Sequence, residues 1–166
     1  GKRITKQKLN ERTDGLNQFI KHVNDLADFA KQYNVKLLIE NNVVAAKNFE
    51  SFGCNPLLMT EAEETKIIFS QVPENVKLLI DVAHLKVSAN TLNFNPVTYL
   101  SDFGDITAAY HISDNNGLED SNEPFTLDSW FVKHIRKDLK YYSLEIYIPD
   151  VEVLEEQYKL LSDILR

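Results

Sequence analysis

The sequence has 166 residues, of which 43% are hydrophobic and 26% charged, a composition typical of a soluble globular protein with a core of its own. Its formal net charge of -7 argues against a nucleic-acid backbone as the main partner, because nucleic-acid-binding proteins normally cluster Lys and Arg. The single cysteine, Cys54, excludes an internal disulfide, and no apolar run approaches membrane-spanning length, so we expect a cytoplasmic protein without membrane contact.

Apolar periodicity and turn residues predict alternating helices and strands along the chain. The predicted elements are helix 14–32, strand 35–40, helix 60–71, strand 76–81, two short helices between 84 and 103, strand 106–112, helix 127–138, strand 141–147 and a last helix that opens at Pro149 and Asp150. Asp14 is the expected N-cap of the first helix, and Thr60 with Glu63 forms a capping-box pattern. Two long polar connections, 41–59 and 113–124, follow the first and third strands.

This alternation predicts an α/β fold with a parallel sheet covered by helices. Residues 35–39 recur letter for letter at 76–80, as expected for a barrel of repeated strand–helix units. A complete eightfold barrel needs roughly 250 residues, so this chain would supply about half of one. Two architectures stay open: a partial (β/α) barrel of the TIM type whose first half is missing, or a smaller open α/β sheet. In either case we expect residues 1–166 to form a single domain.

Each predicted strand ends in a side chain that can bind a metal: Glu40, Asp81, His111 and Glu145. In a parallel sheet these carboxyl ends meet at one edge, where functional groups gather. Three carboxylates and one imidazole suit a divalent ion such as Mn, Co, Mg or Zn, bound by ionised carboxylates and a neutral imidazole. His84 follows Asp81 closely and is a candidate for a further ligand or a substrate contact.

Structural roles are the alternative for these residues, since a carboxylate at a strand end can cap the next helix or pair with Lys or Arg. A structural role explains any single one of these residues as well as metal binding does. It explains less well why five of them lie at one edge of the sheet. For Lys86 we expect a solvated place on a helix face rather than a phosphate contact. For Asp114 we expect a turn or a supporting role beside the ligands.

The four strand ends carry the motifs Leu-Ile-Glu-Asn at 38–41, Leu-Ile-Asp-Val-Ala-His at 79–84, Tyr-His-Ile-Ser-Asp at 110–114 and Ser-Leu-Glu at 143–145. Together they resemble the last four strands of the xylose isomerase-like TIM-barrel superfamily. That group contains sugar and sugar-phosphate isomerases and epimerases, with endonuclease IV as a relative. The resemblance covers essentially the whole chain, aligned on the C-terminal half of the barrel.

The resemblance implies that Glu40, Asp81, His111 and Glu145 bind one divalent metal ion. In the ketose epimerases of the superfamily, the glutamates that match Glu40 and Glu145 also move a proton on opposite faces of an enediolate, and the residue that matches His84 contacts a substrate oxygen. A metal stabilises the charge on the enediolate while a carboxylate acts as general base. The implied activity is metal-dependent isomerisation or epimerisation of a sugar or sugar phosphate.

The chain departs from the family patterns in the loop after His111. Ketose epimerases carry a substrate-binding arginine shortly after the metal histidine, where this chain has Asn-Gly-Leu at 116–118. Many sugar-phosphate relatives have a histidine where this chain has Asn-Glu-Pro at 122–124, and the Asp-x-His zinc pair of endonuclease IV is absent. The alternatives are an endonuclease IV-like phosphodiesterase and a non-catalytic half-barrel that serves as a binding or assembly module. The expected partners are a small-molecule sugar or sugar phosphate and, since open sheet edges invite pairing, a second copy or the missing N-terminal half.

Overall fold

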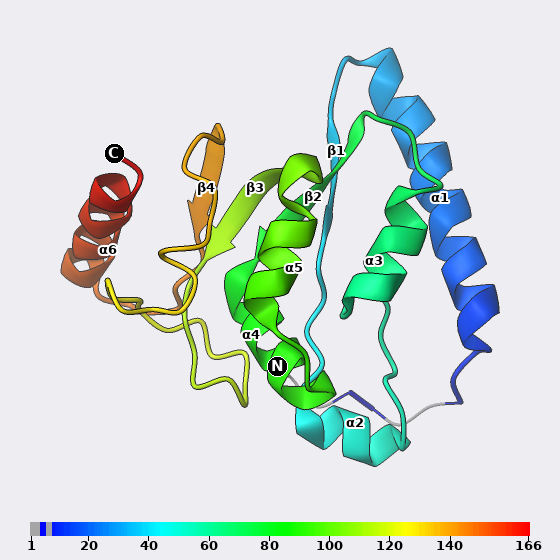
Figure 1. Cartoon of the computed structure of the whole chain (residues 1–166), viewed down its shortest axis with the longest axis horizontal. Helices are drawn as coiled ribbons and strands as arrows, with labels where there is room; N and C mark the ends of the chain where they lie inside the picture. The colour runs from blue at the N-terminus through cyan, green and yellow to red at the C-terminus, as the bar shows by residue number, and fades with distance from the viewer. Residues whose placement is uncertain (1–3, 6–7) are drawn as a thin grey trace.

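Four parallel strands form one sheet in the order β1-β2-β3-β4 in the computed structural model, which describes residues 4–5 and 8–166 (Figure 1). The strands are β1 (Leu37–Glu40), β2 (Val76–Asp81), β3 (Thr107–Ile112) and β4 (Tyr141–Leu144). The predicted α/β fold with a parallel sheet is therefore confirmed. Within the described part of the chain, β1 and β4 each pair on one side only, so the sheet is open, as in part of a TIM barrel.

Six α-helices and one short 3₁₀ helix connect and flank the strands in the described ranges. Their bounds are α1 (Arg12–Gln32), α2 (Ala46–Phe52), α3 (Ala62–Phe69), α4 (Val82–Leu92), α5 (Pro96–Asp102), η1 (Gly104–Ile106) and α6 (Val151–Ile164). In Figure 1, α1 runs beside β1 and α6 lies beyond β4, at the two ends of the sheet. Among the helices of the described residues, none combines the length and the apolar character that crossing a bilayer requires.

The side chains of β2 point alternately to the packed face of the sheet and to the face that carries the candidate ligands. Val76, Leu78 and Ile80 are at most 3% exposed and belong to the main core. Successive side chains of a strand point to opposite faces, so Lys77 and Asp81 lie on the other side of the sheet. The helices thus cover one face, and the opposite face carries the acidic strand end.

Two of the helix starts show how side chains cap the backbone. The Asp81 carboxylate accepts a hydrogen bond from the His84 amide at 2.8 Å and caps α4. Asp150 caps α6 by accepting from the amides of Glu152 and Val153, as its place before the last helix predicts.

The other predicted caps are wrong. Helix α1 begins at Arg12, so Asp14 lies in its first turn rather than at its N-cap. Helix α3 begins at Ala62 without a side-chain cap, because the Thr60 hydroxyl instead accepts from the Asn55 amide group at 2.7 Å. A tertiary contact here replaces the local capping pattern.

The predicted helix over 127–138 is also wrong, since this segment forms a series of turns. Phe131 and Val132 are adjacent and both buried, with 0% and 7% exposure, so the segment packs into the core although it is not helical. The amide of Val132 bonds to the Ser129 carbonyl at 3.1 Å, which is a turn rather than an α-helical spacing. The Ser129 hydroxyl donates to Asp114 at 2.6 Å, so the segment is fixed to the loop after β3 instead.

Candidate metal centre

The register of the parallel strands aligns the four candidate ligands on one face of the sheet. Asp81 of β2 is opposite His111 of β3, and His111 is opposite Ser143 of β4. Glu145 lies two residues beyond Ser143 and therefore points to the same face. Glu40 is opposite Leu79, two residues before Asp81, and also shares this face.

One potential ligand atom from each of Glu40, Asp81, His111 and Glu145 lies within 4.8 Å of all the others. His111 Nδ1 is central: it lies 2.8 Å from Glu145 Oε2, 3.3 Å from Glu40 Oε1 and 3.8 Å from Asp81 Oδ2. Ligands of one divalent ion sit about 2.0–2.6 Å from the metal, so their mutual separations fall in this range. The structure therefore brings together all four residues that the strand ends suggested, in a geometry that could hold a metal ion.

Three of these atoms are buried without a hydrogen-bond partner: Asp81 Oδ2, His111 Nδ1 and Glu145 Oε2. The short His111–Glu145 separation lacks the angles of a hydrogen bond, although the two atoms are close. Buried polar atoms are normally paired, so a cluster of unpaired ones calls for a specific explanation. Converging oxygen and nitrogen atoms without partners fit a hard or borderline cation as the missing partner.

Burial and crowding shift the ionisation of the cluster. Burial raises the pKa of Asp81 to about 7, and the nearby Glu145 carboxylate adds to this effect against the opposing influence of His84. The contact with His111 lowers the pKa of Glu40, and the same contact raises the pKa of His111. Several carboxylates thus share little compensating positive charge, which a divalent cation would supply.

His84 lies at the start of α4, beside the cluster. Its Nδ1 is 3.0 Å from the Asn41 carbonyl oxygen and 3.5 Å from Glu40 Oε1. Burial by itself lowers the pKa of His84, but the contact with Asp120 and the charge of Asp81 raise it to about 9. The structure therefore places His84 at the site where the sequence suggested a ligand or a substrate contact.

Asp120 is the residue of this site that the strand-end pattern missed. It comes from the loop after β3, and its Oδ2 lies 3.4 Å from His84 Nε2. Its Oδ1 is buried without a hydrogen-bond partner. The sequence signal was only the length and polarity of residues 113–124, which does not single out one side chain.

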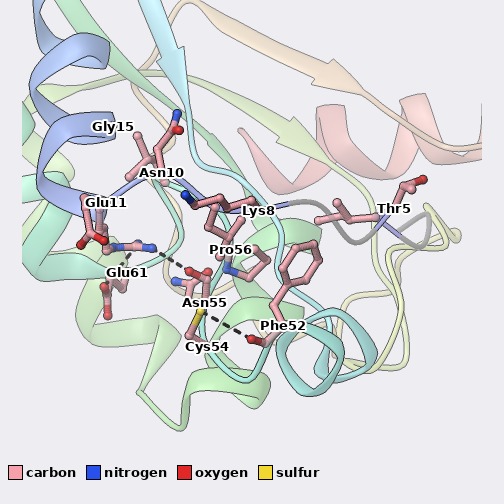
Figure 2. Close-up of a pocket in the computed structure, with 14 residues that line it drawn as sticks. Thr5, Lys8, Asn10, Glu11, Gly15, Phe52, Cys54, Asn55, Pro56 and Glu61 are labelled. Atoms are coloured by element: carbon pink, nitrogen blue, oxygen red, sulfur yellow. Dashed lines mark hydrogen bonds and ion pairs between the residues drawn. The ribbon is translucent and has the colours of Figure 1, made fainter.

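A cavity of about 540 Å³ lies between α1 and β1 and reaches the cluster through Glu40 and His84. Its other walls are largely apolar and include Phe19, Leu26 and Met59. This volume is within the range of small-molecule sites. A second cavity of about 960 Å³, at Phe52, Asn55 and Pro56, is lined by none of the four candidate ligands (Figure 2). Of these two cavities, the smaller one is therefore the one that borders the cluster.

Comparison with known proteins agrees with this arrangement. The family model for the xylose isomerase-like TIM barrel matches residues 3–157. No curated protein matches the sequence. The family match spans nearly the whole sequence and includes every residue of the carboxylate–histidine cluster. The chain therefore belongs to the xylose isomerase-like TIM barrel family.

Proposed function

We propose that the chain binds one divalent metal ion through Glu40, Asp81, His111 and Glu145 and acts as an isomerase or epimerase of a sugar or sugar phosphate. The observation that carries the proposal is the convergence of four ligand atoms within 4.8 Å, three of them buried and unpaired. Membership of the xylose isomerase-like family supports the same assignment.

The cation would supply a Lewis acid that stabilises negative charge on a substrate oxygen. Glu40 and Glu145 come from opposite ends of the sheet, on β1 and just after β4, and both approach His111. One carboxylate removes the proton next to the substrate carbonyl, and the second, or the same one, returns it. His84 holds a substrate oxygen at the side of the site that faces the α1–β1 cavity.

The endonuclease IV-like alternative has less support from the loop after β3. Residues 113–124 contain no histidine and therefore lack the Asp-x-His zinc pair of that enzyme. The non-catalytic alternative predicts that no metal binds at the cluster, so a metal titration distinguishes it from the main proposal.

A titration of Mn²⁺ into the metal-free protein, followed by calorimetry, tests the proposal. We expect one bound ion, and an affinity that falls by about a hundredfold or more in Glu40→Gln and in Glu145→Gln, because each loses a direct ligand. Glu123→Gln removes an exposed carboxylate from the neighbouring loop and serves as the matched control. Tight binding that neither ligand variant weakens would overturn the proposal.

Deuterium exchange from D₂O into ketoses, followed by NMR, tests the proton transfer directly. The carbonyl of a 2-ketose is at C2. Epimerisation places deuterium on C3, whereas isomerisation to the aldose places it on C1 of the ketose. We expect one of these exchanges with the Mn²⁺-loaded protein and a loss of at least about a hundredfold in Glu145→Gln. Exchange at the wild-type rate in this variant would exclude Glu145 as an acid or base.

A further inference from the structure

Glu145 differs from the other three candidate ligands because it lies beyond the end of its strand. The other three are residues of β1, β2 and β3, whereas β4 ends at Leu144. The Glu145 amide still donates to the Ile112 carbonyl at 3.1 Å, so the pairing with β3 continues for one further step. Past this point the sheet no longer fixes the chain, and the orientation of the Glu145 carboxylate depends on contacts from other segments.

Asn122, in the loop after β3, holds the main chain that follows Glu145. Its side-chain amide donates to the Glu145 carbonyl at 2.9 Å, and its own carbonyl accepts from the Tyr147 amide at 3.0 Å. Asn122 is 2% exposed and has a φ of 50°, a left-handed conformation that Asn adopts more readily than most residues with a side chain. Ile146, between the two contacts, is 8% exposed and belongs to the main core. The backbone that carries Glu145 and Tyr147 is therefore fixed.

The side chains of Glu145 and Tyr147 contact each other directly. The Tyr147 hydroxyl donates to Glu145 Oε1 at 3.1 Å. Glu145 Oε2 lies 2.8 Å from His111 Nδ1 and is buried without a hydrogen-bond partner. The two oxygens of this carboxylate thus have different surroundings, because the phenol satisfies one and the other faces the cluster. A hydrogen bond to one oxygen restricts the rotation of the carboxylate and keeps the second oxygen directed at the cluster.

Packing does not explain the position of the Tyr147 side chain, which is 74% exposed. A ring with this exposure adds little to the stability of the core. Tyr158, on α6, is exposed to a similar extent, at 66%, and its hydroxyl has no hydrogen-bond partner in the described part of the chain. Tyr158 therefore provides a matched control for the removal of an exposed tyrosine hydroxyl.

We propose that Tyr147 is a positioning residue of the metal centre, which holds Glu145 Oε1 so that Oε2 is presented to the cation. This inference rests on the proposed function, because it requires that the cluster binds a metal ion, and it adds a residue beyond the four ligands. A carboxylate that is already held in one orientation loses less conformational freedom on binding an ion than a free carboxylate does. The contact with Tyr147 therefore favours metal binding.

Tyr147→Phe, which removes only the hydroxyl, tests the inference. In calorimetric titrations we expect the affinity for Mn²⁺ to fall by about tenfold, as it does on loss of a group that orients a metal ligand. The visible absorption spectrum of the Co²⁺-loaded protein reports the arrangement of the ligands, and it should change in Tyr147→Phe. Tyr158→Phe should leave both the affinity and the spectrum unchanged. The metal-free forms of both variants should unfold at the same urea concentration as the wild type.

A double-mutant cycle shows whether Tyr147 acts through Glu145. In a Glu145→Ala background, the further change Tyr147→Phe should alter the affinity for Mn²⁺ by less than about twofold, because the carboxylate that it positions is gone. A second loss as large as that in the single variant would overturn the inference. A loss of affinity in Tyr147→Phe that accompanies weaker resistance of the metal-free protein to urea would indicate a structural role and would overturn it too.

The ligand variants separate this inference from the proposed function. Tyr147→Phe with the affinity and the Co²⁺ spectrum of the wild type, while Glu40→Gln and Glu145→Gln still weaken binding, overturns the inference alone. Mn²⁺ binding that neither ligand variant weakens overturns the proposed function and the inference with it.

Discussion

At the scale of single residues, Asn41 positions the first two candidate ligands against each other. Its side-chain oxygen accepts from the Asp81 amide at 2.8 Å, and its side-chain nitrogen donates to the Asp81 carbonyl at 3.0 Å. Its own carbonyl contacts His84 at 3.0 Å. The Asn41 side chain, only 2% exposed, thus extends the pairing of β1 with β2 by one step, and the residue as a whole contacts two residues of the site, Asp81 and His84.

Asn41→Ala should therefore weaken Mn²⁺ binding by about tenfold to a hundredfold, as loss of a residue that orients metal ligands usually does. It should also lower the free energy of unfolding by about 2 kcal/mol, because two buried backbone groups of Asp81 lose their partners. Calorimetric titration and urea unfolding measure the two effects. The control is Asn42→Ala at the exposed neighbouring position, and equal effects of the two variants would contradict this role of Asn41.

At the scale of elements, Arg12 and Glu64 join the start of α1 to the start of α3. Arg12 donates to the carbonyls of Asn55 and Leu57 at 2.8 and 2.9 Å and to Glu64 at 3.0 Å. The other oxygen of Glu64 accepts from the Met59 amide at 2.7 Å. Met59 has a φ of 62°, an unusual value for a residue with a side chain, so Glu64 helps to hold a strained turn. The Asn55 side of this junction borders the larger cavity (Figure 2).

The ionisation of Glu64 predicts a pH dependence of stability. Burial raises the pKa of Glu64, although the Met59 amide and Arg12 oppose the shift. The folded state therefore binds this proton more readily than the unfolded state does. Its contribution to stability is full below the unfolded pKa, about 4.3, and is lost as pH rises through the folded pKa.

Relative to the wild type, Glu64→Gln should consequently gain stability between about pH 4 and pH 7, measured by urea unfolding at a series of pH values. Glu63→Gln, at a neighbouring side chain that is 82% exposed, removes the same charge and is the control. A stability difference between Glu64→Gln and the wild type that shrinks as pH rises would show the opposite sign of the shift.

At the scale of the whole molecule, the open sheet has two free edges beside the face that carries the cluster. In the described part of the chain β1 and β4 have free edges, and the face that carries the cluster forms a cavity of about 320 Å³. Leu38, Leu79 and Tyr141 line this cavity, and Tyr141 is 57% exposed. Free edges beside an apolar face favour pairing with another chain.

We expect the chain by itself to self-associate, with its first and last strands covered, and sedimentation velocity over a range of concentrations measures this. Tyr141→Lys should weaken the association by about tenfold or more, because a charge on an edge strand opposes pairing. Leu118→Lys, at a similarly exposed apolar side chain in the loop after β3, is the control. A monomer at every concentration, with amides of β1 and β4 that exchange freely, would contradict this prediction.

The sequence by itself determined the parallel α/β fold and the residues at its strand ends. Strand β2 has the predicted bounds, and Glu40, Asp81, His111 and Glu145 meet at one edge, because parallel strands align their carboxyl ends. These features follow from local patterns, namely apolar runs of strand length and the polar residues that end them.

Only the tertiary structure decided the features that depend on contacts between distant segments. Turns occupy 127–138 where a helix was predicted, and the Ser129 hydroxyl fixes them to Asp114, a residue distant in the chain. Asp120 reaches His84 because Lys86 and Asn122 anchor the loop after β3 on both sides. Lys86 is thus a partly buried partner of Asp114 and not the solvated helix-face residue that the sequence predicted. Local patterns contain no information on such contacts, since their energy arises only when segments far apart in the chain pack together.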